Sequence, residues 1–327
     1  MPAFVPTSPF RAARGLSSPH AQTIFAALCR PRHSARLARE RWETPDGDFL
    51  DVDRLFNDQK KPHVLVLHGL EGSSAAGYVA EIFRRIQQKG WNGTGLNFRS
   101  CGGEPNRLAR SYHSGETSDA LFALRKIRAA ATGEVFAVGF SLGGNVLLRL
   151  LAETAEHAPL DAAAAISVPY DLDACAQALD QGGGWIALYR RRFLHSLRRK
   201  ALEKSKRFPD SFTASPIRSL RGIRAFDDAV TAPLHGFADA AQYYARCSSG
   251  PVLGKIARPA LLIHALDDPM VPSAIPAEAQ ANPLLSLLVT QRGGHCGFVG
   301  GSIARPQYWA EEQALDFLSL HASSRPP

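Results

Sequence analysis

The sequence predicts an α/β fold with a mostly parallel central sheet, helices on both faces and an inserted helical cap. Short apolar runs alternate with helical patterns over residues 49–168 and again over 251–321, as they do in βαβ units. Several of these runs end in loops of glycine and polar residues, and parallel sheets bind ligands at that edge. Between the two stretches, residues 169–250 keep only helical patterns. We therefore expect one sheet-based core that a cap interrupts.

Each element is assigned from its apolar period and from the turn residues that bound it. The expected strands cover residues 49–55, 63–67, 91–98, 134–140, 162–168, 259–264 and 284–290. The expected helices of the core and the N-terminus cover residues 21–28, 76–89, 119–130, 145–152 and 309–321. The expected segments are an N-terminal extension packed on the core (1–44), a first core part (45–168), the cap (169–250) and a second core part (251–327).

Composition limits the class of protein. A chain of 327 residues with 45% hydrophobic and 21% charged residues can bury a large core. Its longest apolar run, residues 162–168, is far shorter than the roughly 20 residues that cross a bilayer. The start of the chain lacks the features of a secretory signal, so we expect a cytoplasmic protein. The five cysteines form no Cys-x-x-Cys pair, which argues against a disulfide framework and a zinc site.

The net charge of +8 is concentrated in one segment. Residues 189–207 contain nine Lys or Arg and one Glu, an excess that equals the excess of the whole chain. This local charge argues against a nucleic-acid binder. It leaves two interpretations, a solvated helical face or a surface that holds the cap against anionic lipid at the inner membrane.

The pattern Gly-x-Ser-x-Gly around Ser141 follows an apolar strand and precedes a helical pattern. In such a strand–turn–helix the serine takes a strained conformation, and the glycines make room where strand and helix crowd together. The hydroxyl is thereby presented above the sheet edge. The start of the helix adds unpaired N–H groups that stabilise an oxyanion. We expect Ser141 to be a nucleophile.

A serine nucleophile needs a base, and the base needs an acid that fixes its tautomer. His295 follows the last expected strand and lies among glycines, and Asp268 follows the strand before it. The order Ser, Asp, His is that of the α/β-hydrolase fold. Asp267 competes for the acid position; we prefer Asp268 because its spacing from Ala265 and the Pro269 after it match the usual turn of these enzymes.

The expected oxyanion hole consists of two backbone N–H groups. One belongs to Leu142, next to the nucleophile, and the other to Leu70, which follows His68-Gly69 at the end of an earlier strand. Each such donor contributes about 3 kcal/mol of transition-state stabilisation. For His68 itself we favour a structural role over a catalytic one.

Other candidate sites are weaker. A metal site would have to use His68, His113 and His295, but no two of them show ligand spacing. A thiol nucleophile at Cys101 or Cys296 lacks the strand–turn–helix context of Ser141. We expect neither metal nor cofactor.

Seven motifs resemble those of the YheT-like α/β-hydrolases, bacterial relatives of the membrane-associated ABHD-type lipid hydrolases of eukaryotes. The motifs lie at residues 15–23, 45–49, 68–72, 97–99, 112–117, 139–145 and 293–298. The resemblance extends from about Gly15 to Leu318 and implies a serine esterase with the triad Ser141, Asp268 and His295. This chain departs from the pattern at Ala21 and Cys296, and neither departure affects the triad.

The predicted function is a serine carboxylesterase that cleaves small-molecule acyl esters, of short to medium chain or derived from lipids, through an acyl-enzyme on Ser141. Two alternatives stay open. An acyltransferase would use the same triad with an alcohol or a thiol in place of water. A non-catalytic binding protein would keep the fold without turnover.

Overall fold

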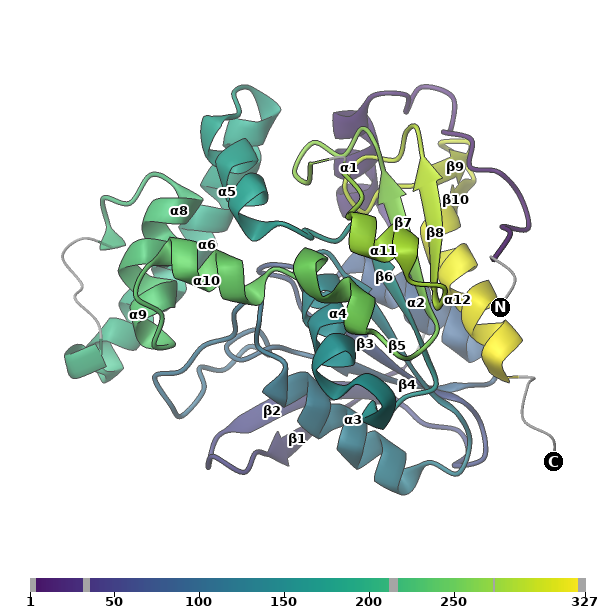
Figure 1. The fold of residues 1–327 in the computed structure, drawn as a ribbon, viewed down its shortest axis with the longest axis horizontal. Helices are drawn as coiled ribbons and strands as arrows, with labels where there is room; N and C mark the ends of the chain where they lie inside the picture. The colour runs from purple at the N-terminus through teal and green to yellow at the C-terminus, as the bar shows by residue number, and fades with distance from the viewer. Residues whose placement is uncertain (1–3, 32–35, 212–216, 273, 323–327) are drawn as a thin grey trace.

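The computed structural model describes residues 4–31, 36–211, 217–272 and 274–322, so the outer ends of the first and last expected segments, 1–3 and 323–327, lie outside it. Eight strands form one sheet in the order β1-β2-β4-β3-β5-β6-β7-β8. The five neighbouring pairs from β4 to β8 are parallel, and β1 and β2 join that edge antiparallel. The structure confirms the expected α/β fold with a mostly parallel sheet (Figure 1).

The strands have the following bounds: β1 Ala38–Glu43, β2 Phe49–Leu55, β3 His63–Leu67, β4 Asn92–Leu96, β5 Val135–Phe140, β6 Ala162–Ile166, β7 Ala260–Ala265, β8 Leu285–Thr290, β9 Val299–Gly301 and β10 Pro306–Tyr308. All residues of β3 to β7 are buried. This explains why β3, β5, β6 and β7 read as largely apolar runs without alternation, whereas β4 is buried although it is rich in glycine and polar residues. The short strands β9 and β10 pair antiparallel outside the main sheet.

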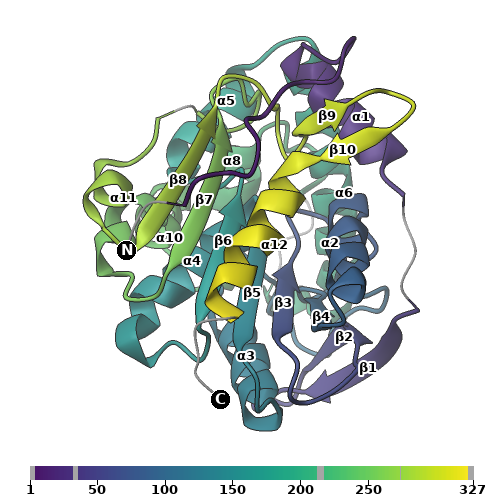
Figure 2. The ribbon, with the colours of Figure 1, turned by 90° about the vertical axis from the view of Figure 1, so that its right-hand side faces the viewer.

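Helices cover both faces of the sheet. Their bounds are α1 Pro19–Cys29, α2 Gly77–Gln88, α3 Ser118–Ala130, α4 Leu142–Thr154, α5 Leu172–Gln181, α6 Trp185–Arg207, α8 Ile223–Phe226, α9 Ala232–Leu234, α10 Ala240–Cys247, α11 Ala277–Ala281 and α12 Trp309–Ala322. One core lies between the sheet and α3 and α4, and the other between the sheet and α2 and α12 (Figure 2). No helix in these described ranges combines the length and the apolar character needed to cross a bilayer.

The segment between β6 and β7 is helical and lies to one side of the sheet (Figure 1). We name its helices α5 to α10 the cap. They share their own apolar core, which includes Leu179, Leu194, Phe226 and Tyr243. A π-helical turn, Asp227–Thr231, joins α8 to α9. The cap therefore has a packed interior and is more than a loop laid over the site.

The first strand, β1, corrects the expected boundary of the core. Residues 38–43 fall within the segment assigned to an extension, yet they pair with β2 along its whole length. The strand is mostly exposed and highly charged, and its Arg39 and Arg41 form ion pairs with Asp53 and Asp51. Charged residues are common on edge strands because they oppose aggregation. They also hide the apolar alternation that would identify a strand.

Candidate active site

Ser141 lies in the turn between β5 and α4, at the C-terminal edge of the parallel strands. Its φ of +51° and ψ of −119° are the strained values expected for such a turn. A Cβ on Gly139 would lie 2.5 Å from the Gly143 carbonyl oxygen, and one on Gly143 would lie 2.5 Å from that of His68. Glycine is required at these two positions because the strand and the helix approach so closely.

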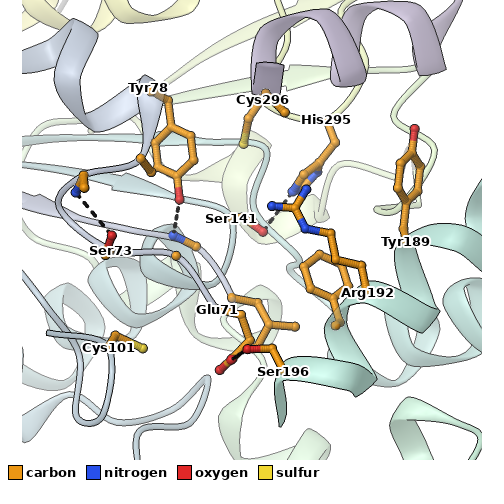
Figure 3. Close-up of a pocket in the computed structure, with 18 of the residues that line it drawn as sticks. Glu71, Ser73, Tyr78, Cys101, Ser141, Tyr189, Arg192, Ser196, His295 and Cys296 are labelled. Carbon is orange, nitrogen blue, oxygen red and sulfur yellow. Dashed lines mark hydrogen bonds between the residues drawn. The ribbon is translucent and has the colours of Figure 1, made fainter. Parts of the chain in front are cut away.

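The structure brings Ser141, His295 and Asp268 together from three separate loops. His295 Nε2 lies 3.0 Å from Ser141 Oγ, and His295 Nδ1 lies 2.8 Å from Asp268 Oδ2. Figure 3 shows the His295 ring directed at the serine within a cavity. With Asp268 ionised, Nδ1 carries the ring proton, so Nε2 is free to accept the hydroxyl proton of Ser141.

The two neighbouring carboxylates have different partners. Asp268 Oδ1 accepts hydrogen bonds from the N–H groups of Met270 and Val271, which leaves Oδ2 for His295. Asp267 Oδ1 instead accepts a hydrogen bond from the Gly294 N–H, at 2.9 Å. The geometry therefore favours Asp268 over Asp267 as the partner of the imidazole.

The environment of His295 favours a proton on its ring. Burial by itself lowers the pKa of the imidazole, but the Asp268 carboxylate beside Nδ1 outweighs it and raises the pKa well above the ordinary value. The imidazolium that forms when His295 accepts the proton of Ser141 is therefore stabilised. The pH of the solution therefore has to lie above this raised pKa for His295 to be neutral.

Two backbone N–H groups border the same space as the serine. Leu70 and Leu142 line a cavity together with Ser141 and His295. Within the described residues, neither of these two N–H groups has a hydrogen-bond acceptor in the protein. The turn that carries Leu70 is held by Tyr78, whose hydroxyl accepts the Gly69 N–H at 2.9 Å.

Glu71, the residue after Leu70, joins several parts of the site through its carboxylate, a role that the sequence did not indicate. It has a φ of +54°, rare for a residue with a side chain. Its carboxylate accepts hydrogen bonds from Tyr112 at 2.7 Å, from Lys200 at 3.0 Å and from Ser196. Lys200 and Ser196 belong to α6, so the cap is fastened to the loop that carries Leu70. Glu71 lies in the motif at residues 68–72, and this was the sequence signal that could have identified it.

The other candidate residues have separate, structural surroundings. His68 is fully buried, Nδ1 lies 2.7 Å from the Gly69 carbonyl oxygen, and Nε2 accepts the Phe98 N–H, which agrees with a structural role. Burial lowers the pKa of His68 to about 4. The rings of His113 and His235 lie close together, with centroids 4.5 Å apart and planes tilted by 53°. No group of three potential metal-binding side chains forms within the described ranges.

The two cysteines differ from an activated thiol. Burial raises the pKa of Cys101 to about 11, which opposes the thiolate form. Cys296 is buried next to His295, and its N–H donates to Ser167 Oγ at 2.9 Å. Neither residue occupies the turn that presents Ser141.

The basic segment is helix α6, and most of its cations are engaged in contacts within the protein. Five of the nine donate hydrogen bonds to the core or to other parts of the cap: Arg190, Arg198, Lys200, Lys204 and Arg207. The Nζ of Lys204, for example, lies 2.9 Å from the Ala109 carbonyl oxygen. Arg192 and Arg199 instead line the cavity at Ser141, with no partner among the described residues. The charge is thus partly structural, which neither interpretation from sequence anticipated.

Two cavities meet at Ser141 and His295. The larger, of about 900 Å³, runs between α1 and α6 and is the one drawn in Figure 3. The smaller, of about 130 Å³, extends into the cap between apolar side chains such as Leu142, Leu179 and Ile223. The serine hydroxyl therefore has a wide groove on one side and a narrow apolar pocket on the other.

Comparison with known proteins agrees with this geometry. A family model described as alpha/beta hydrolase fold matches residues 62–302. The Escherichia coli protein named "Putative esterase YheT" is 40% identical over 98% of this chain and 96% of its own length. Phospholipase ABHD3 of Homo sapiens is 28% identical over 91% of this chain and 75% of its own. The structure of an esterase from Exiguobacterium antarcticum superposes with a TM-score of 0.54 at 17% identity, covering 86% of this chain and 99% of that one.

These similarities extend the resemblance beyond the motifs. The family model covers most of the chain, and the Escherichia coli relative aligns with nearly all of it. The solved esterase supports the fold alone, because its identity is low. The chain belongs to the α/β-hydrolase fold family, in the group of YheT-like proteins.

Proposed function

We propose that this protein is a serine carboxylesterase with Ser141 as nucleophile, His295 as general base and acid, and Asp268 as the acid that orients His295. The observation that carries the proposal is the pair of hydrogen bonds that joins the three side chains, 3.0 Å and 2.8 Å long. The family contains proteins named as esterase and phospholipase, which agrees with ester hydrolysis.

In the acylation step, Ser141 Oγ attacks the ester carbonyl carbon while its proton moves to His295 Nε2. The oxyanion that forms accepts hydrogen bonds from the N–H groups of Leu70 and Leu142. When the tetrahedral intermediate collapses, the bond to the alcohol oxygen breaks and His295 returns the proton to the departing alcohol. Water then attacks the acyl-enzyme, gives its proton to His295, and the carboxylic acid leaves as Ser141 regains a proton.

The two cavities support an assignment of the two halves of the ester. The narrow pocket is lined mainly by apolar side chains, so it suits an acyl chain, and its volume of about 130 Å³ favours short to medium lengths. The wider groove holds Arg192 and Arg199, so it suits a larger and more polar alcohol. This division explains how one site accepts a chain and a head group at once.

The test is turnover of p-nitrophenyl esters of increasing chain length by the wild type and by Ser141→Ala. We expect an optimum at short to medium chains and loss of nearly all activity in Ser141→Ala, with the fold retained. A fluorophosphonate should label the wild type only, which would contradict a binding protein without turnover. Products formed with an added alcohol or thiol acceptor distinguish hydrolysis from acyl transfer. Normal turnover by purified Ser141→Ala would overturn the proposal.

We further propose that the groove takes its esters from an anionic lipid surface. Leu28, Trp185 and Leu188 line the groove and are more than half exposed, at 66%, 52% and 51%. The same groove is lined by the cations Arg192 and Arg199, which have no partner in the part of the chain that the structure describes. Apolar side chains beside cations are the composition of a surface that binds anionic lipid.

Vesicle binding tests this contact. Changing Arg191, Arg192 and Arg199 to Gln should weaken co-sedimentation with anionic vesicles at low salt. The matched control removes the same charge at Lys60, Lys61 and Lys255, exposed residues that precede β3 and β7 at the opposite edge of the sheet. Equal pelleting of the two triple variants would exclude docking through the groove.

A further inference from the structure

Helix α1 lies against the loop that carries His295. The helix is in the N-terminal part of the chain, before the residues 62–302 that the family model matches. Both ribbon views place it beside β9 and β10, the strands that follow this loop (Figures 1 and 2). Ala26 of the helix shares a small apolar cluster with Val299 and Tyr308. The contact thus joins two regions that are nearly 300 residues apart in sequence.

Thr23 contacts the backbone of His295 directly. Its Oγ1 donates to the Pro19 carbonyl oxygen at 2.8 Å, and the same oxygen accepts the His295 N–H at 2.9 Å. Because the hydroxyl proton is used within the helix, a lone pair is directed at the His295 N–H. The Thr23 hydroxyl therefore holds the backbone of His295 against α1.

Gln22 and Arg30 hold the residues that follow His295. Gln22 is fully buried, donates to the Val299 carbonyl oxygen at 3.0 Å and accepts the Val299 N–H at 2.7 Å. Arg30 donates to the Gly297 carbonyl oxygen at 3.0 Å and pairs with the buried Glu311 at 2.6 Å. The loop is thereby bonded to α1 at His295 and Val299, and to Arg30, the residue after the helix, at Gly297.

The loop needs this support because its own backbone is strained. Cys296 and Phe298 have φ values of +50° and +45°, which cost energy for residues with side chains. A Cβ on Gly294 would lie 2.4 Å from the Pro19 carbonyl oxygen, so the helix and the loop are in direct contact. Such conformations persist only where the surroundings determine them.

We propose that Thr23 and Gln22 are positioning residues for His295, so that α1 is part of the catalytic apparatus. The inference rests on the proposed function of the triad. The imidazole has to reach Ser141 and Asp268 at once, and a displacement of about 1 Å can reduce a rate about 100-fold. By fixing the His295 backbone, α1 therefore acts on the chemical step through the position of the imidazole.

The variant Thr23→Val tests the proposal because it removes the hydroxyl and preserves the shape. We expect kcat to fall about 10- to 100-fold with KM nearly unchanged, and Thr23→Ser to restore most of it. The matched control is Thr154→Val at the far end of α4, where Oγ1 donates to the Leu150 carbonyl oxygen in the same way but touches no loop of the site. Its kcat should stay within twofold of the wild type.

A double-mutant cycle separates positioning from stability. Asp268→Asn already removes the correct orientation of the ring, so adding Thr23→Val should cost less than threefold more. Additive losses, or equal kcat for Thr23→Val and Thr154→Val, would overturn the proposal. If Thr23→Val does not fold, Thr23→Ala takes its place in the cycle. Full activity in Ser141→Ala would instead reject the triad, so the two failures are distinguishable.

Discussion

The groove at Ser141 has two helical walls, and each wall holds a different loop of the site by a different kind of interaction. Helix α1 holds the His295 loop through neutral hydrogen bonds that Thr23 and Gln22 accept from the N–H groups of His295 and Val299. Helix α6 holds the Leu70 loop through the ion pair of Lys200 with Glu71, at 3.0 Å. The Glu71 side chain is nearly buried, whereas that of Lys200 is 22% exposed.

The difference shows which wall depends on solution conditions. Neutral buried hydrogen bonds respond little to salt or pH, and the Arg30–Glu311 ion pair beside α1 is shielded because both side chains are buried. A partly exposed ion pair is screened by salt. We infer that the α1 wall is a permanent part of the scaffold, while the α6 wall, which belongs to the cap, is the adjustable one.

The largest expected effect comes from removing the negative charge of Asp268, the partner of His295. Asp268→Asn should reduce kcat about 10⁴-fold, because an amide favours the wrong histidine tautomer and preserves the shape. Asp267→Asn is the control, since its carboxylate contacts the Gly294 N–H instead of the ring. We expect it to stay within about tenfold in kcat for a soluble ester. A more severe loss in Asp267→Asn would transfer the acid role to that residue.

A smaller effect is expected on the α6 side. Glu71→Gln breaks the ion pair and leaves Lys200 without a counter-charge, so the Leu70 N–H should shift from its place in the oxyanion hole. Loss of a whole oxyanion donor costs about 100- to 1,000-fold in kcat, and a displaced one should cost about 10- to 100-fold. Glu203→Gln, an exposed carboxylate that lines the same groove, should be neutral. Equal kcat for the two variants would show that α6 does not hold the loop.

The pH dependence should come from the His295 side alone. His295 acts as a base only when neutral, and Asp268 raises the pKa of its imidazole. Activity should therefore rise with pH, with a midpoint above the ordinary value of about 6.5, and fall about tenfold per unit below it. The pKa of Lys200 is also raised, by its neighbours Cys101 and Glu71 against the effect of burial, so its ion pair should persist over this range. A second ionisation near neutrality in the pH profile would contradict the assignment of the pH dependence to His295 alone.

The smallest effect is the response to salt. Raising the ionic strength from about 0.05 M to 0.5 M should reduce the kcat of the wild type by less than about threefold, through screening of the Lys200–Glu71 pair. Glu71→Gln should lack this response, whereas Thr23→Val should keep it. Steady-state kinetics on a neutral soluble ester measure it. A salt effect that survives in Glu71→Gln would have to come from another ion pair.

Much of the site was predictable because its signals are local in sequence. The strand, glycine and serine pattern around Ser141 determines a turn by steric exclusion, and the structure has that turn. His295 and Asp268 follow late strands, and parallel strands bring their C-terminal ends to one edge. The preference for Asp268 over Asp267 agrees with the geometry because the turn after β7 directs successive side chains differently.

The sequence by itself therefore determined the α/β class, the strands β2 to β8 of the main sheet and the three side chains that meet at the site. Tertiary structure alone decided how those loops are held. Thr23 and His295 are 272 residues apart, and Lys200 and Glu71 are 129 apart, so no local period records either contact. The basic character of α6 was visible in the sequence, but whether each cation faces solvent, the groove or a carbonyl oxygen depends on how the cap packs on the core.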